Sequence, residues 1–477
     1  MNNKSSISAS MFMRSIAKFS ISSWTGFIFG ILAVSITTRV FTPDIVGHLN
    51  MFNSMVDIFV SLTLVGMGAV VNRFFYELPA GWSLQQFFTR CLFITGMALM
   101  LSAILIMSGF FNELFYDLLQ DNSMLIRLLF ILNTLSVIVL TYFLSQFYRF
   151  SNDVYHFNIQ QILIQFFSKL FVVIAALVRP TLDVVLTFNT IGIFMLMIVF
   201  VYLQRKQVFS WRNGGWLSRE FRPLYRYAFF SWPNEIVSRF SGFILPYLVT
   251  TYLSATELGI YSSAGYFVAV FVVLQGGFRT YWAAFMYKYY RTERGKICKI
   301  HSYVAIFIIM LMVFAIIFQH VVYMLIGEAF HGSRLFFTLV LIPPILGLWE
   351  QTTSYGISLS QKNEQLMFIS ITSIALNVIG IYLCIEKWQL LGAAIGVCIA
   401  AVVRFLLITW RGQVYYKSIR NSRESILGLI ILLGLAISNV VLNHDYCFEL
   451  VIVLFFLMSM FAVYRQSLLE FYHLIRR

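Results

Sequence analysis

Apolar runs of about 20 residues, the length a helix needs to cross a hydrocarbon core of about 30 Å, recur along the whole chain. Only 11% of the residues are charged, against about a quarter in soluble domains. Inside a membrane the backbone must satisfy its own hydrogen bonds, which favours helices, and the alternating pattern of a β-barrel is absent. The sequence therefore predicts an all-α, multi-pass membrane protein.

We expect about 14 spans from the hydropathy pattern. Their approximate ranges are 19–38, 46–71, 87–110, 125–147, 157–178, 182–203, 227–250, 258–280, 301–325, 335–360, 366–385, 390–410, 424–442 and 447–464. The run at 19–38 is too long for a signal-peptide core, and no small-residue cleavage site follows it, so we expect it to be retained as the first span.

The basic residues test this count. Most of the 34 Lys and Arg residues fall on one side of the predicted spans, in loops near 205–226, 288–299 and 411–423, whereas the opposite side holds Arg39, Arg179, Arg334 and Lys387. Because Lys and Arg accumulate in cytoplasmic loops, this asymmetry predicts that both termini are cytoplasmic. It also accounts for the net charge of +14 without a nucleic-acid partner.

The basic loop at 205–226 is the natural boundary between two halves. It predicts an N-terminal lobe over 1–204 with six spans, a C-terminal lobe over 227–412 with six more, and two extra spans with a cytoplasmic tail over 413–477. A hydroxyl residue stands five positions before a glycine in each half, Thr42 before Gly47 and Ser254 before Gly259. These pairs indicate a parallel internal repeat, although two similar short loops could also arise by chance.

Motifs for enzymatic chemistry are missing. The chain has no phosphate loop, dinucleotide turn, HExxH or GxSxG pattern. Cys298 and His301 form a lone CxxH without a second half, and the five cysteines are scattered. We therefore expect no metal, no cofactor and no catalytic residue, and a transporter rather than an enzyme.

Polar residues inside the spans are the remaining functional signal, because several of them recur on one helical face. The stripes are Asn50, Asn53, Ser54, Asp57 and Ser61 in the second span; Asn158, Gln161, Gln165 and Ser168, with Lys169 beside them, in the fifth; Ser231, Asn234, Glu235, Ser238 and Ser241, with Arg239, in the seventh; and Ser370, Ser373 and Asn377 in the eleventh. Glu350 follows Pro343-Pro344 in the tenth span, where we expect a break or kink.

Two interpretations of these stripes compete. The side chains can line one shared, hydrated cavity, or each polar group can satisfy a neighbouring helix. A charge at the centre of a span costs about 2.5–3.5 kcal/mol, which favours the cavity for Lys169, Arg239, Asp57 and Glu350. Glu235 and Arg239, at i and i+4, could instead pair with each other. Arg39 and Arg279 are further candidates. Arg39 lies at the outer mouth and could be an interface anchor, whereas Arg279, like Arg404, lies near a cytoplasmic end of a span and could simply snorkel to the interface.

These residues resemble a known family. The segments that carry the resemblance are Thr37–Pro43 through Gly47, Asn72–Tyr76, Tyr227–Pro233, Leu253–Ser262, and Gly392–Gly396, which is also a GxxxG motif like Gly26–Gly30. Together they resemble the polysaccharide-export flippases of the multidrug/oligosaccharidyl-lipid/polysaccharide (MOP) superfamily, most of all the Wzx-type O-antigen flippases. The similarity extends over roughly the first 410 residues.

The resemblance implies two six-helix lobes around a central cavity, with two C-terminal helices added, in a bacterial cytoplasmic membrane. It implies alternating access that moves undecaprenyl-pyrophosphate-linked oligosaccharide units from the cytoplasmic to the periplasmic leaflet. Membrane lipid and other assembly proteins, a polymerase and a chain-length regulator, would be partners. Lys169, Arg239 and Arg279 suit the anionic pyrophosphate. Asp57, Glu235 and Glu350 depart from a purely basic cavity and could pair with these cations or couple a cation gradient.

Two other functions stay open. A drug/cation antiporter of the same superfamily needs a cavity in which acidic residues dominate. A membrane polymerase or ligase typically needs a large outer loop with catalytic residues, and each predicted outer loop is short. The sequence favours the flippase over both.

Overall fold

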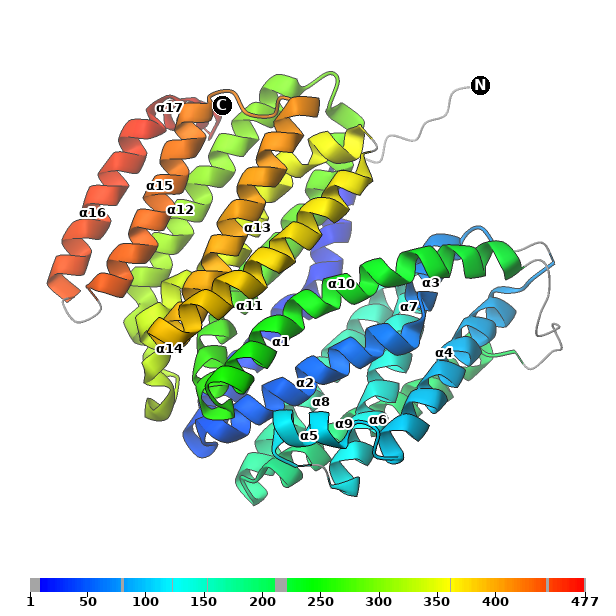
Figure 1. Ribbon diagram of the computed structural model, residues 1–477. Helices are drawn as coiled ribbons and strands as arrows, with labels where there is room; N and C mark the ends of the chain where they lie inside the picture. The colour runs from blue at the N-terminus through cyan, green and yellow to red at the C-terminus, as the bar shows by residue number, and fades with distance from the viewer. Residues whose placement is uncertain are drawn as a thin grey trace, which may run out of the picture. The chain divides into compact units, whose positions relative to one another are not determined.

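The computed structural model describes residues 9–78, 81–121, 123–151, 153–210, 221–360, 362–442 and 446–475. All regular structure within these ranges is helical, and no strand occurs in them (Figure 1). The predicted fold class is confirmed.

The first ten helices run through the N-terminal half of the chain. They are α1 (Ala9–Val40), α2 (Pro43–Leu64), α3 (Met67–Phe74), α4 (Leu84–Met107), α5 (Asn112–Leu119), α6 (Met124–Val137), α7 (Ser145–Phe150), α8 (Val154–Val178), α9 (Leu182–Val208) and α10 (Arg222–Tyr252). A π-helical segment, η1 (Ile138–Leu144), joins α6 to α7 without a break.

The remaining helices lie in the C-terminal half of the chain. They are α11 (Ala255–Tyr289), α12 (Arg294–Met324), the 3-10 helix η3 (Glu328–Phe336), α13 (Phe337–Leu359), α14 (Asn363–Tyr415), α15 (Ser422–Val441), α16 (Tyr446–Val463) and α17 (Arg465–Ile475). Within α14 the backbone of Gln389 leaves the helical region, with φ 49° and ψ −127°, so α14 consists of two helices.

Each of the 14 predicted spans overlaps a helix in the described part of the chain, but the second, at 46–71, is interrupted at Val65–Gly66, where α2 ends before α3 begins. Ten described helices are long and apolar enough to cross a membrane by length and composition, and Trp24–Val40 and Phe448–Val463 are shorter apolar helices. The break in α14 supplies one more span. The last is α10, which is less apolar because it carries Arg222, Arg226, Glu235 and Arg239.

By their contacts the residues divide into two compact units, which we describe separately. The N-terminal unit runs from Ile21 to Gly259, and the C-terminal unit holds Ile260–Arg477 with the start of α1. α10 packs on α2 and α3 and so belongs to the N-terminal unit. Residues 211–220 of the predicted boundary loop at 205–226 lie outside the described residues, and the division into lobes at that loop stays a prediction.

Phe130 on α6 is the centre of an aromatic core in the N-terminal unit. Phe52 and Phe59 of α2 and Phe115 of α5 each meet its ring edge-on, with ring centroids 5.6, 5.0 and 5.2 Å away. Such pairs contribute about 0.5–1.5 kcal/mol each beyond their burial. These ring contacts hold α2 against α6. The opposite, polar face of α2 remains available for contacts with α10.

Gly47 and Gly259, the glycines of the predicted repeat, meet each other. A Cβ on Gly47 would collide with the carbonyl oxygen of Ala255, the first residue of α11, and a Cβ on Gly259 would collide with that of Pro43, the first residue of α2. Thr256 also donates a hydrogen bond to Asp44, 3.4 Å away. The two short segments thus make the same close contact with each other, glycine against the first residue of the facing helix.

The two GxxxG motifs behave differently. Gly392 and Gly396 face the backbone of Cys384 and Gly380–Ile381, so this motif brings the two halves of α14 close together, as predicted. Gly26 faces the side chain of Gln165 on α8, which confirms close approach for that residue. Gly30 has open space where a Cβ would stand.

The Gly47 crossing leads to a stability prediction. Gly47→Ala and Gly259→Ala should each destabilise the protein by about 1–3 kcal/mol, because a methyl group would push one helix away from the other's backbone. Gly30→Ala is the matched control and should leave stability unchanged or slightly raised. The measurement is thermal unfolding of detergent-purified protein followed by circular dichroism. Equal unfolding temperatures for all three variants would contradict the close crossing.

Candidate functional site

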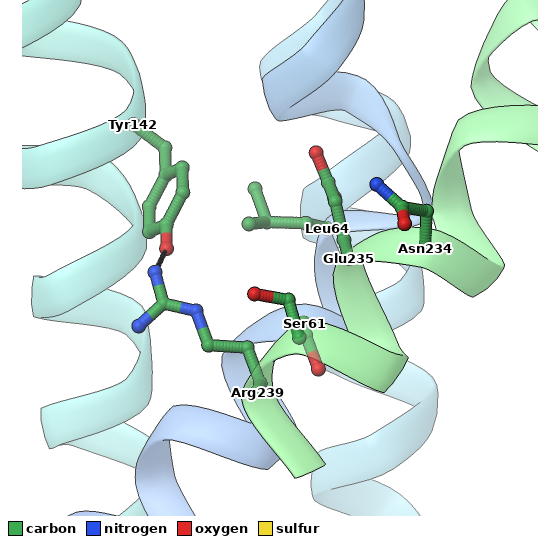
Figure 2. A pocket seen from close by; sticks show the side chains of 7 residues that line it. Ser61, Leu64, Tyr142, Asn234, Glu235 and Arg239 are labelled. Carbon is green, nitrogen blue, oxygen red and sulfur yellow. Dashed lines mark hydrogen bonds between the residues drawn. The ribbon is translucent and has the colours of Figure 1, made fainter. Parts of the chain in front are cut away.

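The polar face of α10 lines a cavity of about 240 Å³ in the N-terminal unit. Its lining residues are Ser61 and Leu64 of α2, Tyr142 of η1, and Asn234, Glu235, Ser238 and Arg239 of α10 (Figure 2). The four α10 residues occupy positions i, i+1, i+4 and i+5, which share one side of a helix. The polar stripe predicted in the seventh span therefore faces a cavity at these positions.

Arg239 is the cation of the cavity. Figure 2 shows its guanidinium directed at Tyr142, and it donates a hydrogen bond to the Tyr142 hydroxyl. It also pairs with the Asp57 carboxylate of α2 over 3.4 Å. The two side chains of this ion pair are 41% and 56% exposed, and such exposed pairs contribute about 0–1 kcal/mol. The guanidinium is therefore oriented by its partners without being strongly held by Asp57.

A π-helix presents Tyr142 to Arg239. Single-turn π segments inside α-helices occur frequently at functional sites, because they displace the side chains that they carry. The hydroxyl of Ser145, the first residue of α7, donates to the Leu140 carbonyl of η1, five residues earlier, over 2.7 Å. Gln161 of α8 in turn donates to the Ser145 hydroxyl over 2.8 Å. The irregular segment is thus tied to the neighbouring helix.

Glu235 faces a break between α2 and α3. Val65 and Gly66 adopt left-handed backbone angles, with φ of 48° and 73°, which is strained for a β-branched residue such as Val. Helix α3 restarts at Met67, and the Ala69 backbone N–H donates to the Glu235 carboxylate. A carboxylate at a helix N-terminus is stabilised by the unpaired N–H groups and the helix dipole there. The second oxygen, Glu235 Oε2, is buried without a hydrogen-bond partner among the described residues.

α10 is anchored to the broken helix on both sides of this site. Trp232 donates its indole N–H to the Ser61 carbonyl over 2.9 Å. A Cβ on Gly66 would collide with the Ala228 carbonyl oxygen, so the break can lie directly against α10 only with glycine at this position. These contacts fix the register between the two polar stripes, one on α2 and one on α10.

The structure thus brings together five of the residues chosen from the sequence. Asp57, Asn234, Glu235 and Arg239 surround or adjoin the cavity, and Asn53 lies exposed one turn before Asp57 on α2. No ion pair within 4 Å joins Glu235 to Arg239 in the described part of the chain, since the partner of Arg239 is Asp57. Which of these residues bind a substrate stays a prediction.

Four other candidates lie elsewhere. Gln165 packs against Gly26 of α1, and Lys169, one turn later on α8, is exposed and has no hydrogen-bond or ion-pair partner among the described residues. Arg39 is exposed in the last turn of α1. The side chain of Arg279 lies outside the described residues.

Glu350 and Asn377 belong to the C-terminal unit. Both carboxylate oxygens of Glu350 accept from Arg404 of α14, over 3.1 and 3.2 Å, and Arg404 also donates to Ser370 over 3.3 Å. Arg404 is therefore half of a bidentate ion pair and not simply an interface anchor. The Oδ1 atom of Asn377 is buried without a partner among the described residues.

Tyr142 is the polar residue of the cavity lining that sequence reasoning missed. A tyrosine in an apolar run gives no signal of its own, and a π-helix has no sequence signature that we could use. The break at Val65–Gly66 does have a signal in the sequence, because Gly66 and Gly68 interrupt the second apolar run.

Among the comparisons with known proteins, the one with solved structures supports the fold. No protein-family model matches the chain, and no curated protein matches it at a significant level. Among solved structures, the lipid II flippase MurJ in an inward closed conformation matches with a TM-score of 0.71 and 15% identity, over 96% of this chain and 99% of that one.

Two multidrug transporters are also similar. An inward-facing MATE family transporter of the MOP superfamily matches with a TM-score of 0.56 and 13% identity, over 84% of this chain and 98% of that one. The MATE multidrug transporter DinF-BH matches with a TM-score of 0.56 and 13% identity, over 85% of this chain and 95% of that one.

The Glu235 contact leads to a local prediction. Glu235→Ala should weaken the first turn of α3 by about 1 kcal/mol, because the Ala69 N–H loses its acceptor. Hydrogen exchange of the Ala69 amide should then be about fivefold faster than in the wild type. Asn234→Ala, the neighbouring substitution on the same cavity, is the control and should leave that rate unchanged. An unchanged rate in Glu235→Ala would show that Glu235 does not hold α3.

The fold shared with MurJ covers 96% of the chain, and the fold shared with the two MATE transporters covers 84% and 85% of it. The described helices are consistent with about 14 spans, and the chain is a multi-pass membrane protein with the fold of these structures.

Proposed function

We propose that the protein is a flippase for undecaprenyl-pyrophosphate-linked oligosaccharide units, which it moves from the cytoplasmic to the periplasmic leaflet by alternating access. The observation that carries this proposal is Arg239, a guanidinium on a membrane-spanning helix that faces a polar cavity. Charged residues inside spans are costly and commonly mark substrate pathways. The likeness to a lipid II flippase supports the same class of cargo.

Arg239 suits the pyrophosphate for geometric reasons. A guanidinium presents its N–H donors in a planar fork that matches two phosphate oxygens at once. The hydrogen bond to Tyr142 and the ion pair with Asp57 hold this fork at the cavity before the substrate arrives. The exposed pair with Asp57 is weak, so an incoming phosphate can replace the carboxylate at little cost.

The size of the cavity limits what it can hold. Ligand pockets commonly measure about 300–1,000 Å³, and the cavity on α10 measures about 240 Å³. It can take a pyrophosphate or one sugar ring, but no complete oligosaccharide. We infer that it anchors the headgroup, with Ser61, Asn234 and Ser238 available to hydroxyl groups. Lys169 and Arg279 are proposed as further contacts of the anionic cargo.

The membrane and the partners follow from this proposal. The protein would lie in the bacterial cytoplasmic membrane with both termini in the cytoplasm, as the distribution of Lys and Arg predicts. A polymerase and a chain-length regulator would receive the units that it delivers.

Substitutions at Arg239 test the flippase. Arg239→Ala should reduce surface polysaccharide at least tenfold, and Arg239→Lys should restore only part of it, because an ammonium cannot make the bidentate contact. Asp57→Asn should retain export, since it removes the competing carboxylate. Lipid-linked oligosaccharide on each leaflet is measured in cells that carry each variant, with membrane insertion checked by immunoblot. Normal export by Arg239→Ala would contradict the proposed role of the cavity.

A cation-coupled drug antiporter is the second candidate, and one observation favours it. Two carboxylates, Asp57 and Glu235, stand at the same cavity as one guanidinium, so the described charges there favour a cation. The MATE fold is also that of multidrug transporters.

Dye transport separates the two candidates. In proteoliposomes with a proton gradient, the antiporter would export a cationic dye, and Asp57→Asn with Glu235→Gln would abolish this export. The flippase hypothesis predicts no dye transport above that of empty liposomes, and it predicts that Arg239→Ala matters more than either carboxylate.

A further inference from the structure

Four polar side chains are buried together at one end of the C-terminal unit. Gln319 of α12, Thr338 of α13, Asn439 of α15 and Glu449 of α16 are 2%, 0%, 1% and 6% exposed. The helices that carry them pack on one another through α15. A carboxyl group buried in a span is expensive and calls for a partner, which makes the hydrogen bonds of Glu449 informative.

Asn439 connects the other three side chains. Its Nδ2 donates to the Gln319 Oε1 over 2.8 Å and to the Glu449 carboxylate. Its Oδ1 lies 3.1 Å from the Thr338 hydroxyl. Among the described residues, Asn439 is the hydrogen-bond donor to Glu449, so an ionised Glu449 depends on the orientation of this amide.

The Thr338 hydroxyl reveals a second arrangement of the same atoms. Its oxygen lies 2.9 Å from the Ala436 carbonyl and 3.1 Å from Asn439 Oδ1, which are both acceptors, and a hydroxyl has one hydrogen to donate. If the Asn439 amide turns by about 180°, Nδ2 donates to Thr338 while Thr338 donates to Ala436, and both bonds are satisfied.

Turning the amide has a consequence for Glu449. Asn439 Oδ1 then faces Gln319 and Glu449 in place of Nδ2. Gln319 can supply a hydrogen by turning its own amide, but a carboxylate cannot. Glu449 can supply one only as the protonated acid. The two amide orientations therefore correspond to ionised and protonated Glu449.

We propose that Glu449 is a proton-binding site, with the bound proton between the Glu449 carboxyl and Asn439 Oδ1. Proton uptake turns the Asn439 amide and passes its N–H from Glu449 to Thr338. Proton release reverses both changes. The site lies in the C-terminal unit and uses none of the residues around Arg239, so it goes beyond the proposed function and does not depend on it.

Other charged and titratable groups near Glu449 lie on η3 and α12. Arg334 of η3 interacts electrostatically with Glu449, and its Nε is buried without a hydrogen-bond partner among the described residues. On the neighbouring α12, Tyr323 bonds to Ser333, and His331 of η3 contacts the Tyr323 and Ile326 carbonyls. His444 and Asp445, close to Glu449 in the chain, lie outside the described residues, and the experiment must control for them.

Infrared difference spectroscopy tests this site directly. Spectra of the purified full-length protein in nanodiscs are recorded at about pH 5 and about pH 8, and one is subtracted from the other. A carboxyl group that changes protonation between these pH values appears in the difference as the C=O band of its acid form. The wild type should show a band that Glu449→Gln removes. Glu328→Gln, which alters an exposed carboxylate near the same end of the unit, should keep it, and so should Asp445→Asn and His444→Ala.

Asn439→Leu supplies the second readout. It removes the hydrogen-bond donor to ionised Glu449. The pH at which the C=O band reaches half its full intensity should therefore rise by about one unit or more. A merely structural Glu449 would give the same spectrum in the wild type and in Glu449→Gln, which would overturn the proposal. A band that responds to Na⁺ at fixed pH and not to pH at fixed Na⁺ would also overturn it. Circular dichroism of each variant confirms that the comparison is between folded proteins.

Discussion

The site on α10 depends on the requirement that a charge inside a span must have partners. An arginine at the centre of a membrane-spanning helix costs about 2.5–3.5 kcal/mol, and the cost falls when the guanidinium is hydrated or paired. Arg239 meets this requirement through Tyr142 and Asp57. The π-helix that presents Tyr142 and the break between α2 and α3 both lie against this face of α10. The two irregular backbone segments, η1 and the break between α2 and α3, thus both lie at the polar stripe of α10.

The spans and the stripes could be predicted because they rest on simple periodicities. Length and hydropathy gave the spans, including the two halves of α14, which a break at Gln389 separates. A period of 3.6 residues placed Asn234, Glu235 and Arg239 on one face of α10, and the structure puts a cavity there. Hydrophobic patterning carries this information because each helix must place its apolar face against lipid or core.

Partnerships between helices could not be predicted in the same way. The sequence allowed Glu235 to pair with Arg239 four residues later, whereas Asp57 of α2 and the Ala69 N–H of α3 are their partners. The position of Arg404 near the end of a span indicates snorkelling to the interface, whereas its guanidinium forms a bidentate pair with Glu350. These contacts join residues far apart in the chain, and they depend on how α2, α10, α13 and α14 are packed. A single sequence contains no direct record of that packing.

The two charged sites differ in what surrounds them. Arg239 and Asp57 are partly exposed beside a cavity, which suits a ligand that enters and leaves. Glu449 is buried and hydrogen-bonded to the Asn439 amide, which suits a proton. The central claim concerns the first of these sites, namely that Arg239 binds the pyrophosphate of a lipid-linked cargo.

Native mass spectrometry of the purified protein with undecaprenyl pyrophosphate and with undecaprenol tests that claim most directly. We predict that the wild type retains the pyrophosphate lipid over the alcohol, and that Arg239→Ala loses this preference while Arg205→Ala, at the end of α9, keeps it. Equal retention of both lipids by the wild type, or an unchanged preference in Arg239→Ala, would contradict the account.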